Sequence, residues 1–155
     1  MVNDKNFRSG RHVVYDLHAH IVLTPKYRRK VMTPSVHETL EKSIQETCMR
    51  WDIILEEFNT DSEHAHVLIS YPPKVCLSDF IGAIKMKSSK DLRKNNFEEI
   101  KDKLWGKHFW SPSYFIASTG GSPLEKVKKY IENQDKEPKA PGNPSWVGNN
   151  SPSPQ

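Results

Sequence analysis

The sequence predicts an α+β fold of the ferredoxin-like βαββαβ type, an antiparallel sheet with helices on one face, plus an additional C-terminal helix. Two observations predict it. Alternating apolar and polar residues mark the strands, and apolar residues at helical spacing mark the helices between them. In the usual strand order of this fold, the first and third strands lie at the centre of the sheet.

The first strand is predicted from residues 12–24, where apolar and polar side chains alternate throughout. One face of this strand should be buried, and the other face, which carries His18 and His20, should lie in water. A helix follows, with Thr33 as N-cap and Pro34 in the first turn, where the missing N–H of proline costs nothing. Its predicted buried stripe consists of Val36, Leu40, Ile44, Cys48 and Trp51.

Two strands, at about residues 52–58 and 64–71, flank the turn-rich segment 59–62 and should pair as a hairpin. A second helix is predicted to begin at Leu77 or Ser78, with its lysines pointing outward. Its predicted inward positions are Phe80, Ile81, Ile84 and Ser88.

A fourth strand is predicted within residues 105–119, and the two glycines that follow should end it. The last helix should begin after Ser122, with Pro123 at its first position. A single domain is predicted for residues 1–135. Residues 136–155 are rich in Pro, Gly, Ser and Asn and are predicted to form a flexible polar tail.

Charge and composition narrow the class of protein. The formal net charge is +4, and basic residues cluster at positions 26–30 and 85–94. Such clusters are typical of proteins that bind a phosphate backbone, although helix lysines often simply face solvent. Cys48 and Cys76 lie in apolar patterns without metal-binding spacing, so we expect buried, reduced thiols. The sequence contains no apolar stretch of the roughly 20 residues that a membrane span needs. We therefore expect no membrane contact and a cytoplasmic location.

The segment His64-Ala65-His66 lies in the predicted third strand, where alternation places both imidazoles on one face. Two neutral imidazoles spaced i, i+2 can hold a divalent ion from one side and leave positions open for substrate. The alternative interpretation is a solvated strand face. His18 and His20 form a second pair with the same spacing.

The predicted last helix presents a phenol and an amide on one side, because Tyr130 and Gln134 are four residues apart. An amide oxygen can serve as a third ligand to a hard cation, and a phenolic oxygen can serve as a nucleophile. A tyrosine beside the apolar stripe of a helix is more often only packed, so these residues alone leave the role of Tyr130 open.

Together these segments resemble the single-tyrosine transposases of the insertion-sequence 200/605 family. They belong to the HUH endonucleases, named for two histidines that flank a hydrophobic residue. His64-Ala65-His66 resembles that motif, with a small middle residue. Residues 25–30 (PKYRRK) resemble the family's KYR segment, residues 109–115 (FWSPSYF) its WSxxYF segment, and residues 130–134 (YIENQ) its nucleophile helix. The matches occur in family order and span residues 12–134.

The resemblance implies a transposase that cleaves and rejoins single-stranded DNA at hairpin-marked ends. It implies that Tyr130 attacks a phosphodiester to give a 5′-phosphotyrosine and a free 3′-OH, and that His64, His66 and Gln134 bind Mg²⁺ or Mn²⁺. It also implies a homodimer, in which the tyrosine helix of one chain can complete the histidine pair of the other.

The residues expected to contact DNA are Lys26, Tyr27, Arg28, Arg29 and His20. Many relatives carry a histidine at the position of His20, which is expected to line the DNA groove or support the site, whereas His18 is expected at the surface. Trp110 and Tyr114 could stack on bases or pack in the core. Asp61 and Glu63 lie near the histidines but are assigned as turn formers, not as ligands.

Three other functions remain open at this point. One is a domesticated relative that nicks repeated palindromic DNA; hairpin ends flanking the gene would indicate a mobile element instead. Another is a non-catalytic module that binds single-stranded nucleic acid through its sheet, which predicts aromatic residues where this chain has histidines. The last is a metal-dependent nuclease that uses water as nucleophile and leaves no covalent adduct.

Overall fold

A computed structural model describes residues 7–26, 31–103 and 108–119 of the chain. The chain divides after Ser122 into two units. The second unit, residues 123–155, lies outside the described residues. The predicted last helix, the predicted polar tail and the predicted domain boundary at residue 135 lie there too.

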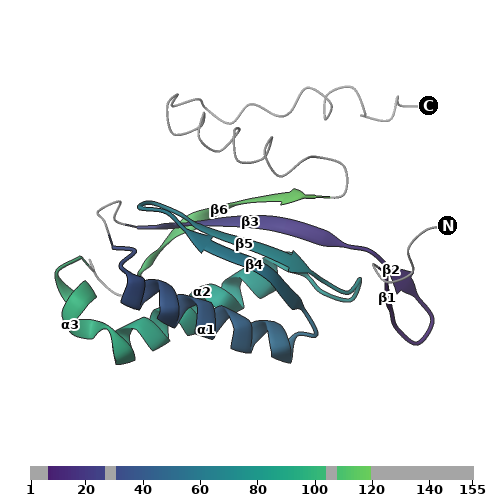
Figure 1. Cartoon of the computed structure of the whole chain (residues 1–155), viewed down its shortest axis with the longest axis horizontal. Coiled ribbons are helices and arrows are strands. Elements are labelled where there is room, and N and C mark those ends of the chain that lie inside the picture. The colour runs from purple at the N-terminus through teal and green to yellow at the C-terminus, as the bar shows by residue number, and fades with distance from the viewer. Residues whose placement is uncertain (1–6, 27–30, 104–107, 120–155) are drawn as a thin grey trace, which may run out of the picture. The chain divides into compact units, whose positions relative to one another are not determined.

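A four-stranded antiparallel sheet forms the centre of the fold, in the order β4-β5-β3-β6. The strands are β3 (His18–Pro25), β4 (Ile54–Thr60), β5 (Ala65–Ser70) and β6 (Trp110–Ser118). The helices α1 (Pro34–Arg50) and α2 (Leu77–Asn95) lie together on one face of this sheet (Figure 1). The first and third strands of the βαββαβ unit are therefore central, which confirms the predicted ferredoxin-like α+β fold.

Short elements complete the described part of the chain. They are β1 (Arg8–Ser9) and β2 (Val14–Tyr15), which form a separate two-stranded sheet, the helix α3 (Phe97–Ile100) and a 3₁₀ turn (Lys101–Lys103). Among the described residues, each helix is either too short or too polar to cross a membrane.

The prediction of one long strand from residue 12 to residue 24 is wrong. The chain leaves the extended sheet at Asp16 and Leu17, because Tyr15 pairs with Arg8 in the small sheet whereas His18 pairs with Ser70 in the large one. The prediction that one face of this strand lies in water is also wrong for its central part, where the side chain of His20 is buried. Alternation of apolar and polar residues indicates which face of a strand each residue occupies, but it does not indicate which strand the residue pairs with.

The helix α1 begins and packs as predicted. Thr33 is its N-cap, and the Thr33 hydroxyl oxygen accepts a hydrogen bond from the backbone N–H of Val36 at 3.2 Å. The four predicted positions within the helix are buried, while Trp51 caps its C-terminus and packs at the edge of the core. Burial raises the pKa of the Cys48 thiol to about 12, so this cysteine is an inert core residue.

The helix α2 buries all four of its predicted inward positions, Phe80, Ile81, Ile84 and Ser88. Cys76, which precedes α2, is exposed, so the prediction that both thiols are buried is wrong for this residue. It occupies the N-cap position of α2, outside the apolar stripe of the helix, and its sulfur lies 3.3 Å from the Ser78 hydroxyl oxygen.

Candidate functional site

The strand β5 divides its side chains between two faces of the sheet. Ala65, Val67 and Ile69 belong to the hydrophobic core on the helical side. Alternation therefore places His64 and His66 on the opposite face. This face is not open to water at the histidines, because His64 is 8% exposed and the side chain of His66 is 16% exposed.

Asp61 belongs to the turn that leads into β5 and contacts both histidines. Its Oδ1 accepts hydrogen bonds from the backbone N–H groups of Glu63 and His64, at 2.8 and 2.7 Å, as a turn former does. The same Oδ1 lies 3.3 Å from Nδ1 of His64, and Oδ2 lies 3.0 Å from Nε2 of His66. One carboxylate thus shapes the turn and faces both imidazoles.

Asp61, His64 and His66 form a cluster that could hold a metal ion, and we call it the histidine cluster. One candidate ligand atom from each residue lies within 4.8 Å of the others. Ligands of a divalent ion stand about 2.0 to 2.2 Å from it, so a small inward movement would bring these atoms into one coordination shell. Two imidazoles and a carboxylate suit a borderline divalent cation better than a purely hard one.

The charge state of Asp61 fits a ligand role. Burial alone would raise the pKa of its carboxyl, but hydrogen bonds from the Glu63 N–H and from His66, together with the charge of His64, lower the pKa overall. The carboxylate is therefore ionised at neutral pH, as a metal ligand must be. Sequence reasoning did not assign Asp61 as a ligand; its place in the turn three residues before His64 was the available signal.

The second histidine pair is split by the fold. His20 is 1% exposed, and its Nε2 lies 3.4 Å from Nδ1 of His66. His18 instead contacts two carboxylates, Asp16 at 2.6 Å and Glu56 through its other ring nitrogen. Identical spacing in the sequence therefore yields one residue at the histidine cluster and one residue in a separate ion-pair group.

The other predicted site residues fall into two groups. Lys26 is exposed at the end of β3. Tyr130, Gln134, Tyr27, Arg28 and Arg29 lie outside the residues that the structure describes.

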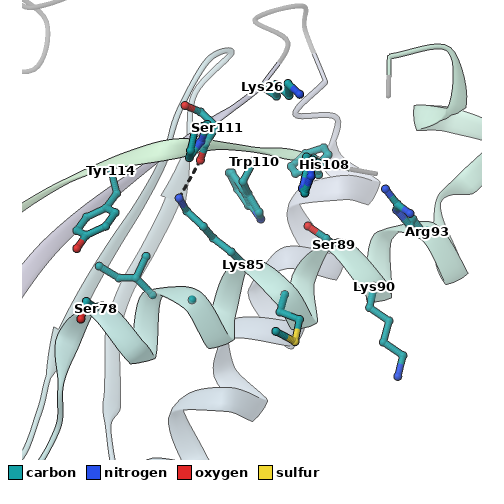
Figure 2. A pocket seen from close by; sticks show the side chains of 15 residues that line it. Lys26, Ser78, Lys85, Ser89, Lys90, Arg93, His108, Trp110, Ser111 and Tyr114 are labelled. Atoms are coloured by element: carbon teal, nitrogen blue, oxygen red, sulfur yellow. Dashed lines mark hydrogen bonds between the residues drawn. The ribbon is translucent and has the colours of Figure 1, made fainter. Parts of the chain in front are cut away.

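A pocket of about 850 Å³ lies between α2 and the start of β6, and we call it the basic pocket (Figure 2). Its basic side chains are Lys26, Lys85, Lys90 and Arg93. Apolar and aromatic groups, among them Met86 and Tyr114, provide the rest of its wall, and no carboxylate belongs to the described lining. The pocket therefore suits a ligand that carries negative charge and a flat apolar part.

The basic side chains of the pocket differ in what they can offer a ligand. Lys85 donates a hydrogen bond to the backbone carbonyl of Ser111 at 2.8 Å (Figure 2). It donates another to the backbone carbonyl of Ser113 at 3.2 Å, and the two bonds tie α2 to β6. Burial lowers the pKa of Lys85. Lys90 is exposed, and two guanidinium nitrogens of Arg93, Nε and Nη2, are buried without a hydrogen-bond partner among the described residues. Lys90 is therefore the exposed cation of α2 in the pocket, and Arg93 is a partly buried one whose Nε and Nη2 no described residue engages.

The two aromatic residues with open roles are also separated by the structure. Trp110 is buried, and its Nε1–H donates to the Ser88 hydroxyl at 2.8 Å, so it is a core residue. Tyr114 is 42% exposed, and the Lys85 ammonium lies 5.5 Å from its ring centroid. Both residues line the basic pocket, and Tyr114 is the one that presents a large exposed surface to a ligand.

Comparison with known proteins identifies the class. A family model for IS200-like transposases matches residues 13–134. The ISDra2 transposase TnpA of Deinococcus radiodurans is 30% identical over 131 residues, which cover 84% of this chain and 93% of that protein. The transposase for insertion sequence element IS200 of Salmonella typhimurium is 30% identical over 132 residues, which cover 85% of this chain and 86% of that protein.

Solved structures agree with these relatives. The structure of a candidate transposase from Deinococcus radiodurans aligns with a TM-score of 0.70 and 27% sequence identity. The alignment covers 82% of this chain and 97% of that transposase. A REP-associated tyrosine transposase bound to a REP hairpin has a TM-score of 0.52 and 13% identity, covering 83% of this chain and 73% of its own, and shares the fold. The chain belongs to the IS200/IS605 family of transposases, as the sequence predicts.

Proposed function

We propose that this protein cleaves and rejoins single-stranded DNA at hairpin-marked ends, with Tyr130 as nucleophile and a divalent ion at the histidine cluster. The observation that carries the proposal is the convergence of Asp61, His64 and His66 in a chain of the IS200/IS605 family. It supports an ion site at the pair of histidines that the sequence singles out. Asp61 joins Gln134 as a candidate third ligand.

The reaction is a transesterification that conserves the energy of the broken bond. The phenolic oxygen of Tyr130 attacks phosphorus and gives up its proton to solvent, the P–O3′ bond breaks, and the departing 3′ oxygen takes up a proton from solvent to become a free 3′-OH. Attack by a new 3′-OH on the phosphotyrosine is the reverse reaction, so a strand can be rejoined elsewhere without ATP. An ordinary tyrosine, with a pKa near 10, is a weak nucleophile at neutral pH and needs help.

The ion would supply that help. Mg²⁺ or Mn²⁺ is proposed to be held by His64, His66 and an oxygen ligand from Asp61 or Gln134. When bound, a divalent cation polarises the phosphate and stabilises the leaving oxyanion. The imidazole donors favour Mn²⁺, since Mg²⁺ prefers oxygen ligands.

The basic pocket is proposed to contact the DNA backbone. Lys26, Lys90 and Arg93 offer positive charge around a pocket whose described lining contains no carboxylate, which suits phosphate groups. Tyr114 is placed to stack on an unpaired base. Arg28, Arg29 and Tyr27 remain proposed DNA contacts on the sequence alone.

A non-catalytic binding module is less well supported. Such a module would stack bases on aromatic residues of its central strands. Here the central strands β3 and β5 carry His20 and His66 on the face away from the helices, and His66 contacts a carboxylate. That arrangement favours metal chemistry over base stacking.

Trapping a covalent adduct tests the proposed function. Labelled single-stranded hairpin DNA is incubated with the protein and Mn²⁺, and the mixture is denatured and analysed by gel. We expect a protein–DNA species that survives denaturation, and we expect Tyr130→Phe to bind the same DNA without forming it. Cleavage without an adduct would instead indicate a nuclease that uses water, and an adduct in Tyr130→Phe would exclude Tyr130 as nucleophile.

The proposed homodimer is tested by mixing two inactive chains. Tyr130→Phe keeps an intact histidine pair, and His66→Ala keeps an intact tyrosine. If the tyrosine of one chain acts at the histidines of the other, the mixture should regain adduct formation that neither variant shows alone. A mixture that stays inactive would argue that each site is built from one chain.

A further inference from the structure

His20 packs directly behind the histidine cluster. Its Nε2 lies 3.4 Å from Nδ1 of His66, and the two ring centroids are 5.5 Å apart with a tilt of 32°. The contact follows from the sheet register. Val22 pairs with His66 and His20 pairs with Leu68, so His20 is the diagonal neighbour of His66 across β3 and β5.

The two ring nitrogens of His66 face different groups. Nε2 points into the histidine cluster, 3.0 Å from Oδ2 of Asp61, and Nδ1 points at His20. A ring nitrogen that binds a metal carries no proton, so a neutral His66 that binds an ion through Nε2 must carry its proton on Nδ1. The atom placed to accept that proton in a hydrogen bond is Nε2 of His20.

We propose that His20 is a positioning residue for the metal centre, which holds the ring of His66 in the orientation and tautomer that present Nε2 to the ion. This inference rests on the proposed function, because it takes the ion site as given. Without an ion, the hydrogen bonds run in the opposite direction: His66 donates to Asp61 through Nε2, and His20 donates to Nδ1 of His66. The pair of His66 Nδ1 and His20 Nε2 serves in both arrangements, and Nε2 of His66 points into the histidine cluster in both, so the ring need not rotate when the ion arrives.

The burial of His20 favours this role over direct contact with DNA. A side chain that is 1% exposed presents almost no surface to a strand, whereas it does present one nitrogen to His66. His18 provides an internal comparison, because it lies two residues earlier on the same strand face but contacts Asp16 and Glu56 instead. The role therefore belongs to the register position, not to the histidine spacing.

Three variants of the full chain test the proposal. His20→Phe keeps a ring and removes the acceptor, His20→Gln can place an amide oxygen or N–H near the position of Nε2, and His18→Gln is the matched control. Mn²⁺ affinity is measured by titration calorimetry, and thermal unfolding confirms that each variant folds. We expect His20→Phe to bind Mn²⁺ about 10- to 100-fold more weakly, as loss of a supporting hydrogen bond typically does. His20→Gln should recover most of that affinity, and His18→Gln should keep it.

DNA binding in EDTA separates this role from a DNA contact, and it should be unchanged in all three variants. A folded His20→Phe chain with wild-type Mn²⁺ affinity would overturn the proposal, as would weaker DNA binding by that chain in EDTA. A wild-type chain that fails to bind Mn²⁺ would instead overturn the proposed function. If His20→Phe does not fold, NMR of the labelled wild-type imidazoles decides: titration with Mg²⁺ should move the His66 proton from Nε2 to Nδ1, and an unmoved proton contradicts the proposal.

Discussion

The histidine cluster and the basic pocket differ in the length of their side chains, in the elements that carry them and in their burial. The cluster uses short side chains from β5 and its preceding turn, backed by β3, and these are the two central strands of the sheet. Its histidines are mostly buried, and the Asp61 carboxylate lies against a ring nitrogen of each. The basic pocket uses long cationic side chains from α2, opposite the edge strand β6, and is partly open to solvent.

We infer from this difference that the proposed chemistry and the proposed DNA affinity depend on separate parts of one small sheet. Short side chains on central strands have few rotamers, so strand register fixes their positions closely enough for catalysis. Long exposed cations can adjust to a flexible phosphate backbone, and their attraction depends on salt. We therefore expect changes in the cluster to affect ion binding and cleavage, and changes in the pocket to affect DNA affinity.

The largest expected effect comes from His66→Ala. Since a metal ion can supply several kcal/mol of transition-state stabilisation, we expect adduct formation at saturating DNA to fall about 10³-fold. Mn²⁺ affinity measured by calorimetry should fall with it, while DNA binding in EDTA should stay at the wild-type level. A parallel loss of DNA binding in EDTA would break the proposed division between the two regions.

Asp61→Asn should have the next largest effect, and it tests whether the carboxylate charge of Asp61 contributes to ion binding apart from the role of this residue in the turn. Asn keeps an oxygen that can accept the backbone N–H groups of Glu63 and His64, so the turn should persist, but the carboxylate charge is lost. We expect Mn²⁺ to bind about 10- to 100-fold more weakly, with an unfolding temperature close to that of the wild type. Asp61→Ala, which also loses the turn hydrogen bonds, should be less stable by about 1 kcal/mol in chemical denaturation.

The double variant Lys90→Gln with Arg93→Gln tests the basic pocket. If each side chain neutralises one phosphate, removing both should weaken single-stranded DNA binding about tenfold and reduce the salt slope of the logarithm of affinity by about 1.4. Fluorescence anisotropy at several salt concentrations measures both quantities. The charge-matched control is the double variant Lys42→Gln with Arg50→Gln, at two exposed positions of α1. Adduct formation at saturating DNA should persist; a loss there, or a slope equal to that of the control, contradicts the assignment.

The smallest expected effect concerns His18 and the pH dependence of stability. Burial alone would lower the pKa of His18, but its hydrogen bonds to Glu56 and Asp16 raise it above 6.5 overall. A raised pKa means that the pairing stabilises the fold below about pH 6.5, and that this contribution is lost as the pH rises through the folded-state value. His18→Gln should therefore lower the unfolding temperature at pH 5.5 and change it little at pH 8.5, without altering Mn²⁺ affinity. Equal effects at both pH values would show that charge is not involved.

The order of elements and most of the core followed from the sequence. The Thr33 cap, the buried stripe of α1 and the inward positions of α2 were predicted correctly, because each depends on residues within a few positions of one another. The same local logic placed His64 and His66 on one face of a strand. It failed for residues 12–24, since local alternation cannot show that β2 and β3 pair with different strands.

The sequence by itself therefore determined the family, the element types and the histidine pair, all of which are written in short segments. Only the tertiary structure decided that His20 and not His18 lies against His66, and that Asp61 both shapes its turn and faces the two imidazoles. It also decided that Lys85 ties α2 to β6 while Lys90 stays exposed. The physical reason is register. Which side chains meet across a sheet depends on how strands far apart in the chain align, and that alignment is fixed by the packing of the whole core.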